Sequence, residues 1–150
     1  MASTESPDFS AGAGSRFATK VAVLLADDIA VWQKLNVTAF LVSGIAASVE
    51  GIVGEPYEDA DGTNYLPMLR QPVTVFEAAR GQLSGAHRRA LERELMMAVY
   101  TADMFDTGHD DANRAAVKVI PRDRLDLVGI GLYGPRGAVD KALKGVRLHP

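Results

Sequence analysis

The sequence predicts an α/β fold: one domain with a small four-stranded mixed sheet and helices on both faces. Short apolar runs alternate along the chain with segments whose apolar residues recur every three or four positions, which is typical of strands alternating with amphipathic helices. The length of 150 residues fits one domain, and 47% hydrophobic with 23% charged residues is typical of globular proteins. We therefore expect a domain over residues 20–150 behind a disordered leader, residues 1–19, rich in Ser, Ala and Gly.

The four expected strands are nearly continuous apolar runs, as in a sheet that is covered on both faces. They lie at residues 20–25, 73–76, 97–101 and 127–132. Tyr57 and Tyr65 flank an Asp-Gly turn, and we expect them to pair in a small hairpin outside the sheet.

The expected helices are indicated by apolar spacing and by residues that begin or end helices. The first spans residues 32–49, and the second spans about 85–96 behind a Ser84 cap. Asp106 or Thr107 is expected to cap a third helix that reaches Val119. The last begins at Pro135, where a missing N–H costs nothing, and ends at Gly145.

Composition excludes several classes of protein. The chain has no cysteine, which excludes disulfides, thiolate metal sites and cysteine nucleophiles, and we expect a cytoplasmic location. No apolar run is long enough for a membrane span. A net charge of −3 disfavours tRNA or another nucleic acid as the main partner, since such proteins usually carry a basic surplus. No cofactor is expected.

The carboxyl end has the glycine spacing of a dinucleotide-binding turn, Gly129-x-Gly131-x-x-Gly134. That site needs a second strand and an acidic residue about 20 residues further on to hold the ribose. Only 16 residues follow Gly134, and Asp140 lies inside the expected last helix. The pattern therefore does not predict a nicotinamide or flavin site.

The same stretch, "LVGIGLYGPRGAVDKALKGVRLHP", resembles the carboxyl end of the type II peptidyl-tRNA hydrolases. There, too, an apolar strand passes through a Gly-Pro turn into a helix bearing Val-Asp-Lys. With "DADGTNYLPMLRQPVTVFEA" and Leu-Tyr-Gly-Pro-Arg, the chain is most similar to a sister family in that fold group, the domain of unknown function 2000 family. The resemblance covers about residues 20–150 and implies the hydrolase-like α/β fold and a homodimer.

The resemblance does not carry over the hydrolase activity. Those enzymes have a lysine leading the first helix, followed by a glutamine and a histidine. Here Lys34 matches the lysine, but Thr38 and Leu41 stand at the other two positions. The family's Asp-Ala-Gly-x-Thr-Gln motif has no counterpart in "PRDRLD", which precedes the last expected strand.

Lys34 opens the first helix, where the helix dipole disfavours a cation. It is expected either to bind a phosphate or carboxylate and act as an electrophilic anchor, or to be a solvated first-turn lysine. Asn36 and Thr38 are polar members of the same helix and are expected to line a ligand pocket or to bond the backbone. The neighbouring Trp32 is interpreted as a hydrophobic staple, with a stacking platform as the alternative.

The turn after the fourth strand is the preferred ligand site. Backbone N–H groups near Gly134 and the guanidinium of Arg136 are expected to bind an anion, and Tyr133 to supply a hydroxyl. The hypothesis requires that Lys34 and Arg136 meet around one hollow.

Asp103 and Asp106 are expected to handle protons in a catalytic reaction. Their stretch also holds His109, for which a general-base role with Asp106 as its orienting partner is an alternative. Helix capping explains the acidic spacing better than a metal site, and no metal is expected.

Two functions remain open at this point. One is a metal-free hydrolase or transferase acting on an acyl ester or amide, with Lys34, Tyr133, Asp103 and Asp106 as catalytic residues. The other is a binding module that holds a small anionic metabolite through Asn36, Thr38, Gly134 and Arg136 without turning it over.

Overall fold

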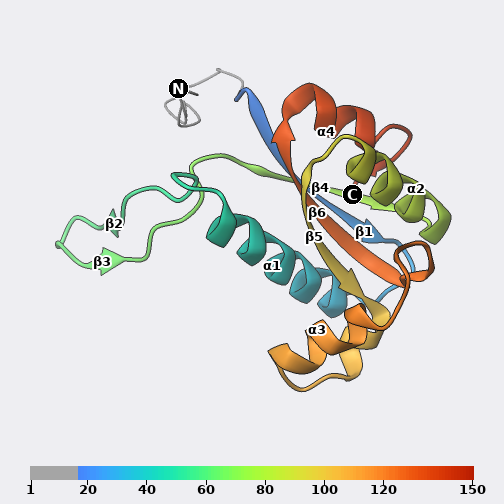
Figure 1. The fold of residues 1–150 in the computed structure, drawn as a ribbon. Coiled ribbons are helices and arrows are strands. Elements are labelled where there is room, and N and C mark those ends of the chain that lie inside the picture. The colour runs from blue at the N-terminus through green and yellow to red at the C-terminus, as the bar shows by residue number, and fades with distance from the viewer. Residues whose placement is uncertain (1–16) are drawn as a thin grey trace, which may run out of the picture.

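The computed structural model describes residues 17–150 as one α/β domain built on a mixed sheet (Figure 1). The sheet has five strands in the order β5-β6-β1-β4-β7, so the expected number of four is wrong. The strands are β1 (Thr19–Ala26), β4 (Val73–Ala78), β5 (Met96–Thr101), β6 (Leu127–Pro135) and β7 (Arg147–Leu148). The additional strand is β7, whose two residues are too few to show an alternating pattern.

Strand directions decide which residues share an edge of the sheet. β1 and β4 are parallel, whereas β6 runs antiparallel to β1 and β5 antiparallel to β6. The carboxyl ends of β1, β4 and β5 therefore lie at one edge, and the carboxyl end of β6 lies at the opposite edge. We call the first the carboxyl edge, and it holds the start of α1 (Val31–Ser48).

Helices cover both faces of the sheet, as expected. The helix α1 packs on one face through Val37, Leu41 and Ile45. On the other face lie α2 (Arg80–Glu92) and α4 (Arg136–Ala142) (Figure 1). Alternate residues of β1 point to the two faces: Val23 and Leu25 toward α1, Ala22 and Leu24 toward α2 and α4.

Two helix starts differ from the expected ones. The helix α2 begins at Arg80, before Ser84, because the side chain of Gln82 accepts the N–H of Ala79 at 3.1 Å and caps the helix there. The chain after β5 first forms a 3₁₀ turn, η1 (Ala102–Asp106), and then α3 (Asp110–Lys118). The cap of α3 is His109, not Asp106 or Thr107, because its Nδ1 accepts the N–H of Ala112 at 3.2 Å.

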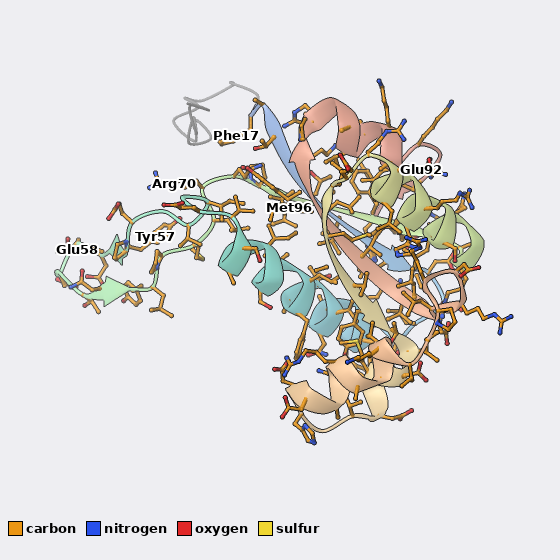
Figure 2. The ribbon with its side chains drawn as sticks, viewed as in Figure 1. Phe17, Tyr57, Glu58, Arg70, Glu92 and Met96 are labelled. Atoms are coloured by element: carbon orange, nitrogen blue, oxygen red, sulfur yellow. The ribbon has the colours of Figure 1, made fainter. Side chains whose placement is uncertain are left out.

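The remaining elements agree with expectation within a few residues. Tyr57 pairs with Tyr65 in the hairpin β2 (Tyr57–Glu58) and β3 (Asn64–Tyr65), which projects from the body (Figure 2). A short 3₁₀ turn, η2 (Arg122–Arg124), precedes β6. The expected leader lies, up to residue 16, outside the described residues, and Thr19 already belongs to β1.

The glycines of the carboxyl-terminal pattern serve packing. A Cβ at Gly129 would lie 2.7 Å from Val37 Cγ1, and one at Gly131 would lie 3.1 Å from Leu41 Cβ. The absence of side chains at these two positions lets α1 approach β6 closely. The Gly-x-Gly spacing thus reflects contact between a helix and a strand.

Candidate functional site

Lys34 stands at the carboxyl edge and does bind a carboxylate, that of the protein's own Glu77. Its Nζ lies 3.4 Å from Glu77 Oε2, and the two side chains are only 15% and 7% exposed. Glu77 is the penultimate residue of β4 and is paired in register with Leu25 of β1. The opposite charge of Glu77 explains why a lysine is tolerated in the first turn of α1.

Glu77 is the centre of a larger charged network. Arg147 of β7 donates from Nε at 2.9 Å and from Nη2 at 2.7 Å to Oε1, and His149 Nε2 lies 3.6 Å from Oε2. The hydrogen bonds from Arg147, and then the one from Lys34, hold the pKa of the Glu77 carboxyl below its ordinary value. The network ties α1, β4 and the carboxyl terminus together.

Arg136 and Gly134 lie at the opposite edge of the sheet, so the expected hollow shared with Lys34 does not form. Gly134 pairs with Lys20 near the start of β1, whereas the partner of Lys34 pairs with Leu25 near its end. At about 3.3 Å per residue, the five residues between these positions correspond to roughly 17 Å along the sheet. The guanidinium of Arg136 donates to the backbone oxygen of Phe17 at 2.9 Å, beside the start of β1 (Figure 2).

Tyr133 is also far from Lys34. Its ring is 6% exposed and packs with Val21 and Ile45, at the carboxyl-terminal half of α1. Its hydroxyl is sealed from solvent and has no hydrogen-bond partner in the described part of the chain. A hydroxyl buried in this way does not face a ligand.

Of the other expected residues, Asn36 lines a hollow. The hydroxyl of Thr38 donates to the backbone oxygen of Lys34 at 2.7 Å. Of the two expected roles of Thr38, this is the bond to the backbone. Asp103 and Asp106 lie exposed in η1 at the carboxyl edge. Residues 17–150 contain no cluster of three or more potential metal ligands from His, Cys, Asp and Glu. Whether any of these residues binds or reacts stays a prediction.

A groove lies between α1 and the segment formed by η1 and α3. It consists of two adjoining hollows of about 340 and 520 Å³ that share Phe40, Tyr100, Met104, Asp110 and Asn113. The smaller hollow is also lined by Trp32, Asn36, Phe105, Thr107, Gly108 and His109, and the larger one by Leu41, Ala98, Val99, Arg114, Val117 and Lys118. We call the whole the aromatic groove. Its size is in the range of sites for small organic ligands.

Four aromatic rings line the groove in a row. Trp32 meets Phe105 edge-on at 6.3 Å between centroids, Phe105 meets Tyr100 at 5.2 Å, and Tyr100 meets Phe40 at 5.8 Å. Trp32 is 63% exposed and Phe40 51% exposed, so neither ring is needed to fill the core. The open position of Trp32 fits the stacking platform better than the staple.

Polar donors open into the same groove. Tyr100 is 5% exposed, and burial raises the pKa of its phenol, so the hydroxyl stays protonated. That hydroxyl has no hydrogen-bond partner among the described residues. It is not one of the fully buried atoms, so it is accessible from the groove. His109 accepts an N–H at Nδ1, which leaves the proton of the neutral ring on Nε2 as a donor and disfavours a role as general base.

Most residues of the aromatic groove were not predicted from the sequence. Phe105 and Tyr100 sit on η1 and β5, far from α1 in the chain. The position of Phe40 also follows from the structure: the buried positions of the helix are 37, 41 and 45, which puts residue 40 outside the packed stripe. A large apolar residue outside that stripe indicates a contact that the core does not supply.

Comparisons with known proteins give one family model and one similar solved structure, both described as of unknown function. No curated protein matches the chain. A solved structure, that of the protein of unknown function Atu0240 from Agrobacterium tumefaciens strain C58, is 47% identical, covers 90% of this chain and 100% of its own, and has a TM-score of 0.87. None of the helices within residues 17–150 has both the length and the hydropathy needed to cross a membrane. The family model described as a protein of unknown function, DUF2000, matches residues 19–150, and the chain therefore belongs to the DUF2000 family.

Proposed function

We propose that the protein binds a small organic ligand in the aromatic groove without turning it over. The observation that carries the proposal is the row of four rings, two of them open to solvent, beside the partnerless hydroxyl of Tyr100. A monomer gains nothing from exposing Trp32 and Phe40, whereas stacking on a flat ligand removes their apolar surface from water.

The donors of the groove define the polar part of the ligand. The hydroxyl of Tyr100 and the Nε2–H of His109 can both donate a hydrogen bond, so a ligand with an acceptor oxygen satisfies both. The ligand is therefore a flat apolar group carrying a carbonyl or carboxylate. With a carboxylate it is a small organic anion of the kind that the binding hypothesis requires.

The test uses Trp32, which is the only tryptophan of the chain and lies in the groove. The probes are 3-phenylpropionate, its amide and propionate, followed by tryptophan fluorescence. We expect saturable quenching with the two aromatic probes and none with propionate, and mass spectrometry should recover the probes unchanged. No saturable response to either aromatic probe would refute the proposal.

A matched pair of variants locates the site. Tyr100→Phe removes one hydroxyl in the groove and should weaken binding about threefold to tenfold, the usual worth of a hydrogen bond. Tyr133→Phe removes a hydroxyl that is buried outside the groove and should leave binding unchanged. Equal effects of the two changes would contradict the assignment.

A hydrolase or transferase acting on an acyl ester or amide is the second candidate. It is favoured by Lys34, whose ammonium is held at the carboxyl edge by a buried carboxylate. A panel of acyl esters and of aminoacyl- and peptidyl-tRNA tests it. Turnover that disappears in Lys34→Ala supports the enzyme, and an inert protein excludes it.

We also propose kinship with the type II peptidyl-tRNA hydrolases, a homodimer and a cytoplasmic location. The kinship rests on the carboxyl-terminal motif, and the location on the lack of cysteine. The dimer is supported by apolar residues of the projecting hairpin and its flank, such as Tyr57, Tyr65 and Leu66, the last of which is 84% exposed. Light scattering coupled to gel filtration tests the dimer directly.

A further inference from the structure

A separate hollow lies on the other face of the sheet, away from the aromatic groove. It has a volume of about 580 Å³ and lies between α2 and the segment that leads from η2 into β6. His87 and Arg88 line it from α2, and Arg122 and Asp123 from η2. Glu92, at the end of α2, completes the charged lining (Figure 2). We call this hollow the arginine pocket.

His87 is the buried polar group of the pocket. It is 7% exposed and has no hydrogen-bond partner within residues 17–150. Among the described residues, the only side-chain nitrogen and oxygen atoms that are fully buried without a hydrogen-bond partner are those of Thr101 and Tyr133. The ring nitrogens of His87 are not among them, so they are accessible from the pocket. Burial, and then the charge of Arg122, lowers the pKa of His87, which leaves a neutral ring able to donate or accept a hydrogen bond.

The charges of the pocket are balanced, and the described residues leave them all without ion pairs. Arg88 and Arg122 supply two guanidiniums, and Glu92 and Asp123 supply two carboxylates. None of these four groups has an opposite charge within 4.0 Å in the described part of the chain.

Two arginines elsewhere in the described chain are paired. Arg80 bridges Asp28 and Asp126 at 2.8 Å each, and Arg147 holds Glu77. In the pocket, by contrast, unpaired charges of both signs line one hollow.

Leucines supply an apolar wall. Leu91, Leu125 and Leu127 line the pocket beside the charged groups, and Leu127 is 4% exposed. A single anion would meet the two pocket carboxylates as well as the guanidiniums. A ligand that carries both charges on an apolar body matches every group in the lining.

We propose that the arginine pocket binds a zwitterion of the α-amino-acid type with an apolar side chain. The guanidiniums of Arg88 and Arg122 receive its carboxylate, because the planar fork of arginine matches two carboxylate oxygens. The carboxylates of Glu92 and Asp123 receive its ammonium, and His87 supplies one further hydrogen bond. The apolar side chain lies against the leucines.

The experiment titrates the full chain with L-leucine, N-acetyl-L-leucine and L-leucinamide by calorimetry. Acetylation removes the ammonium charge, and amidation removes the carboxylate. We expect saturable binding of L-leucine and at least about tenfold weaker binding of each derivative, as charged hydrogen bonds are lost. Equal affinity for leucine and either derivative would overturn the zwitterion, and no saturation by leucine would overturn the site.

Variants tie the binding to the pocket. Arg122→Gln should weaken leucine binding about tenfold, whereas Arg124→Gln, in the same exposed turn but not in the lining, should not. Equal affinities of the two variants would refute the proposal.

A second measurement follows the His87 ring by NMR, because leucine bound through its carboxylate should shift the ring resonances of His87. The groove variant Tyr100→Phe should leave leucine binding unchanged, so failure here and failure of the aromatic groove are distinguishable.

Discussion

The aromatic groove and the arginine pocket lie on opposite faces of one sheet and are built in opposite ways. On the groove side, α1 has no charged residue between Lys34 and Glu50, and aromatic rings line the groove. On the pocket side, α2 has the sequence RGQLSGAHRRALE, and charged groups line the pocket.

The two faces differ in the kind of surface that has no partner within the described chain. On the α1 face, the unsatisfied feature is apolar surface in water, namely the exposed rings of Trp32 and Phe40. On the α2 face, it is charge without a partner and a buried imidazole without a hydrogen bond. Ligands of different chemistry are therefore expected on the two faces.

The largest effect is expected where α1 is packed against the sheet. Gly129→Ala should lower the free energy of unfolding by about 1–3 kcal/mol, because its Cβ would lie 2.7 Å from Val37 Cγ1. Gly81→Ala, on α2, has nothing within 4 Å and should be neutral or stabilising by up to about 1 kcal/mol. Urea unfolding measures both, and similar losses for the two variants would show that the α1 face is not the tighter one.

A smaller effect is expected from the buried hydroxyl of Tyr133. Tyr133→Phe should raise the free energy of unfolding by about 1 kcal/mol, because the hydroxyl is sealed and has no partner. Tyr100→Phe, whose hydroxyl reaches the groove, should change stability less. A loss of stability in Tyr133→Phe, seen by thermal unfolding, would mean that this hydroxyl has a partner.

A smaller effect, on the pH dependence of stability, is expected from His87. Its pKa in the folded chain lies below the unfolded value of 6.5, so the unfolded chain takes up the proton first. The contribution of the neutral His87 ring to the stability of the folded chain is fully present above pH 6.5. It is lost as the pH falls from there through the pKa of His87 in the folded chain.

NMR titration of the His87 ring checks the cause. Arg122→Gln should move the pKa of His87 upward, because one of the two causes of the lowering is removed. An unchanged pKa of His87 in this variant would show that Arg122 does not lie close to His87 in the pocket.

The smallest effect is expected from the acidic residues of η1. Asp103→Asn and Asp106→Asn should each change the free energy of unfolding by less than about 0.5 kcal/mol, since both side chains are exposed. Neither change should alter ligand binding in the groove. A large loss of turnover or binding in either variant would restore the catalytic role that the sequence predicts for these residues.

Local patterns predicted most of the secondary structure because they are set by neighbours in the chain. The apolar run before Asp27 became β1, and the periodicity from Trp32 onward became α1. Helix starts were less predictable. Ser84 is a good capping residue, but α2 begins earlier, where the side chain of Gln82 accepts the N–H of Ala79. His109, an uncommon cap, displaced Asp106 for the same kind of reason.

The sequence alone determined the α/β class and the family resemblance. For Lys34 it left open whether the lysine binds an anion or is solvated, and the tertiary structure pairs it with Glu77. The tertiary structure decided which residues share a site. Arg136 lies far from Lys34 because β6 runs antiparallel to β1, and strand direction depends on pairing between distant segments, which no local period encodes. The aromatic groove joins α1, β5 and η1 across the same sequence distances, so its rings became a site only when the sheet brought those elements together.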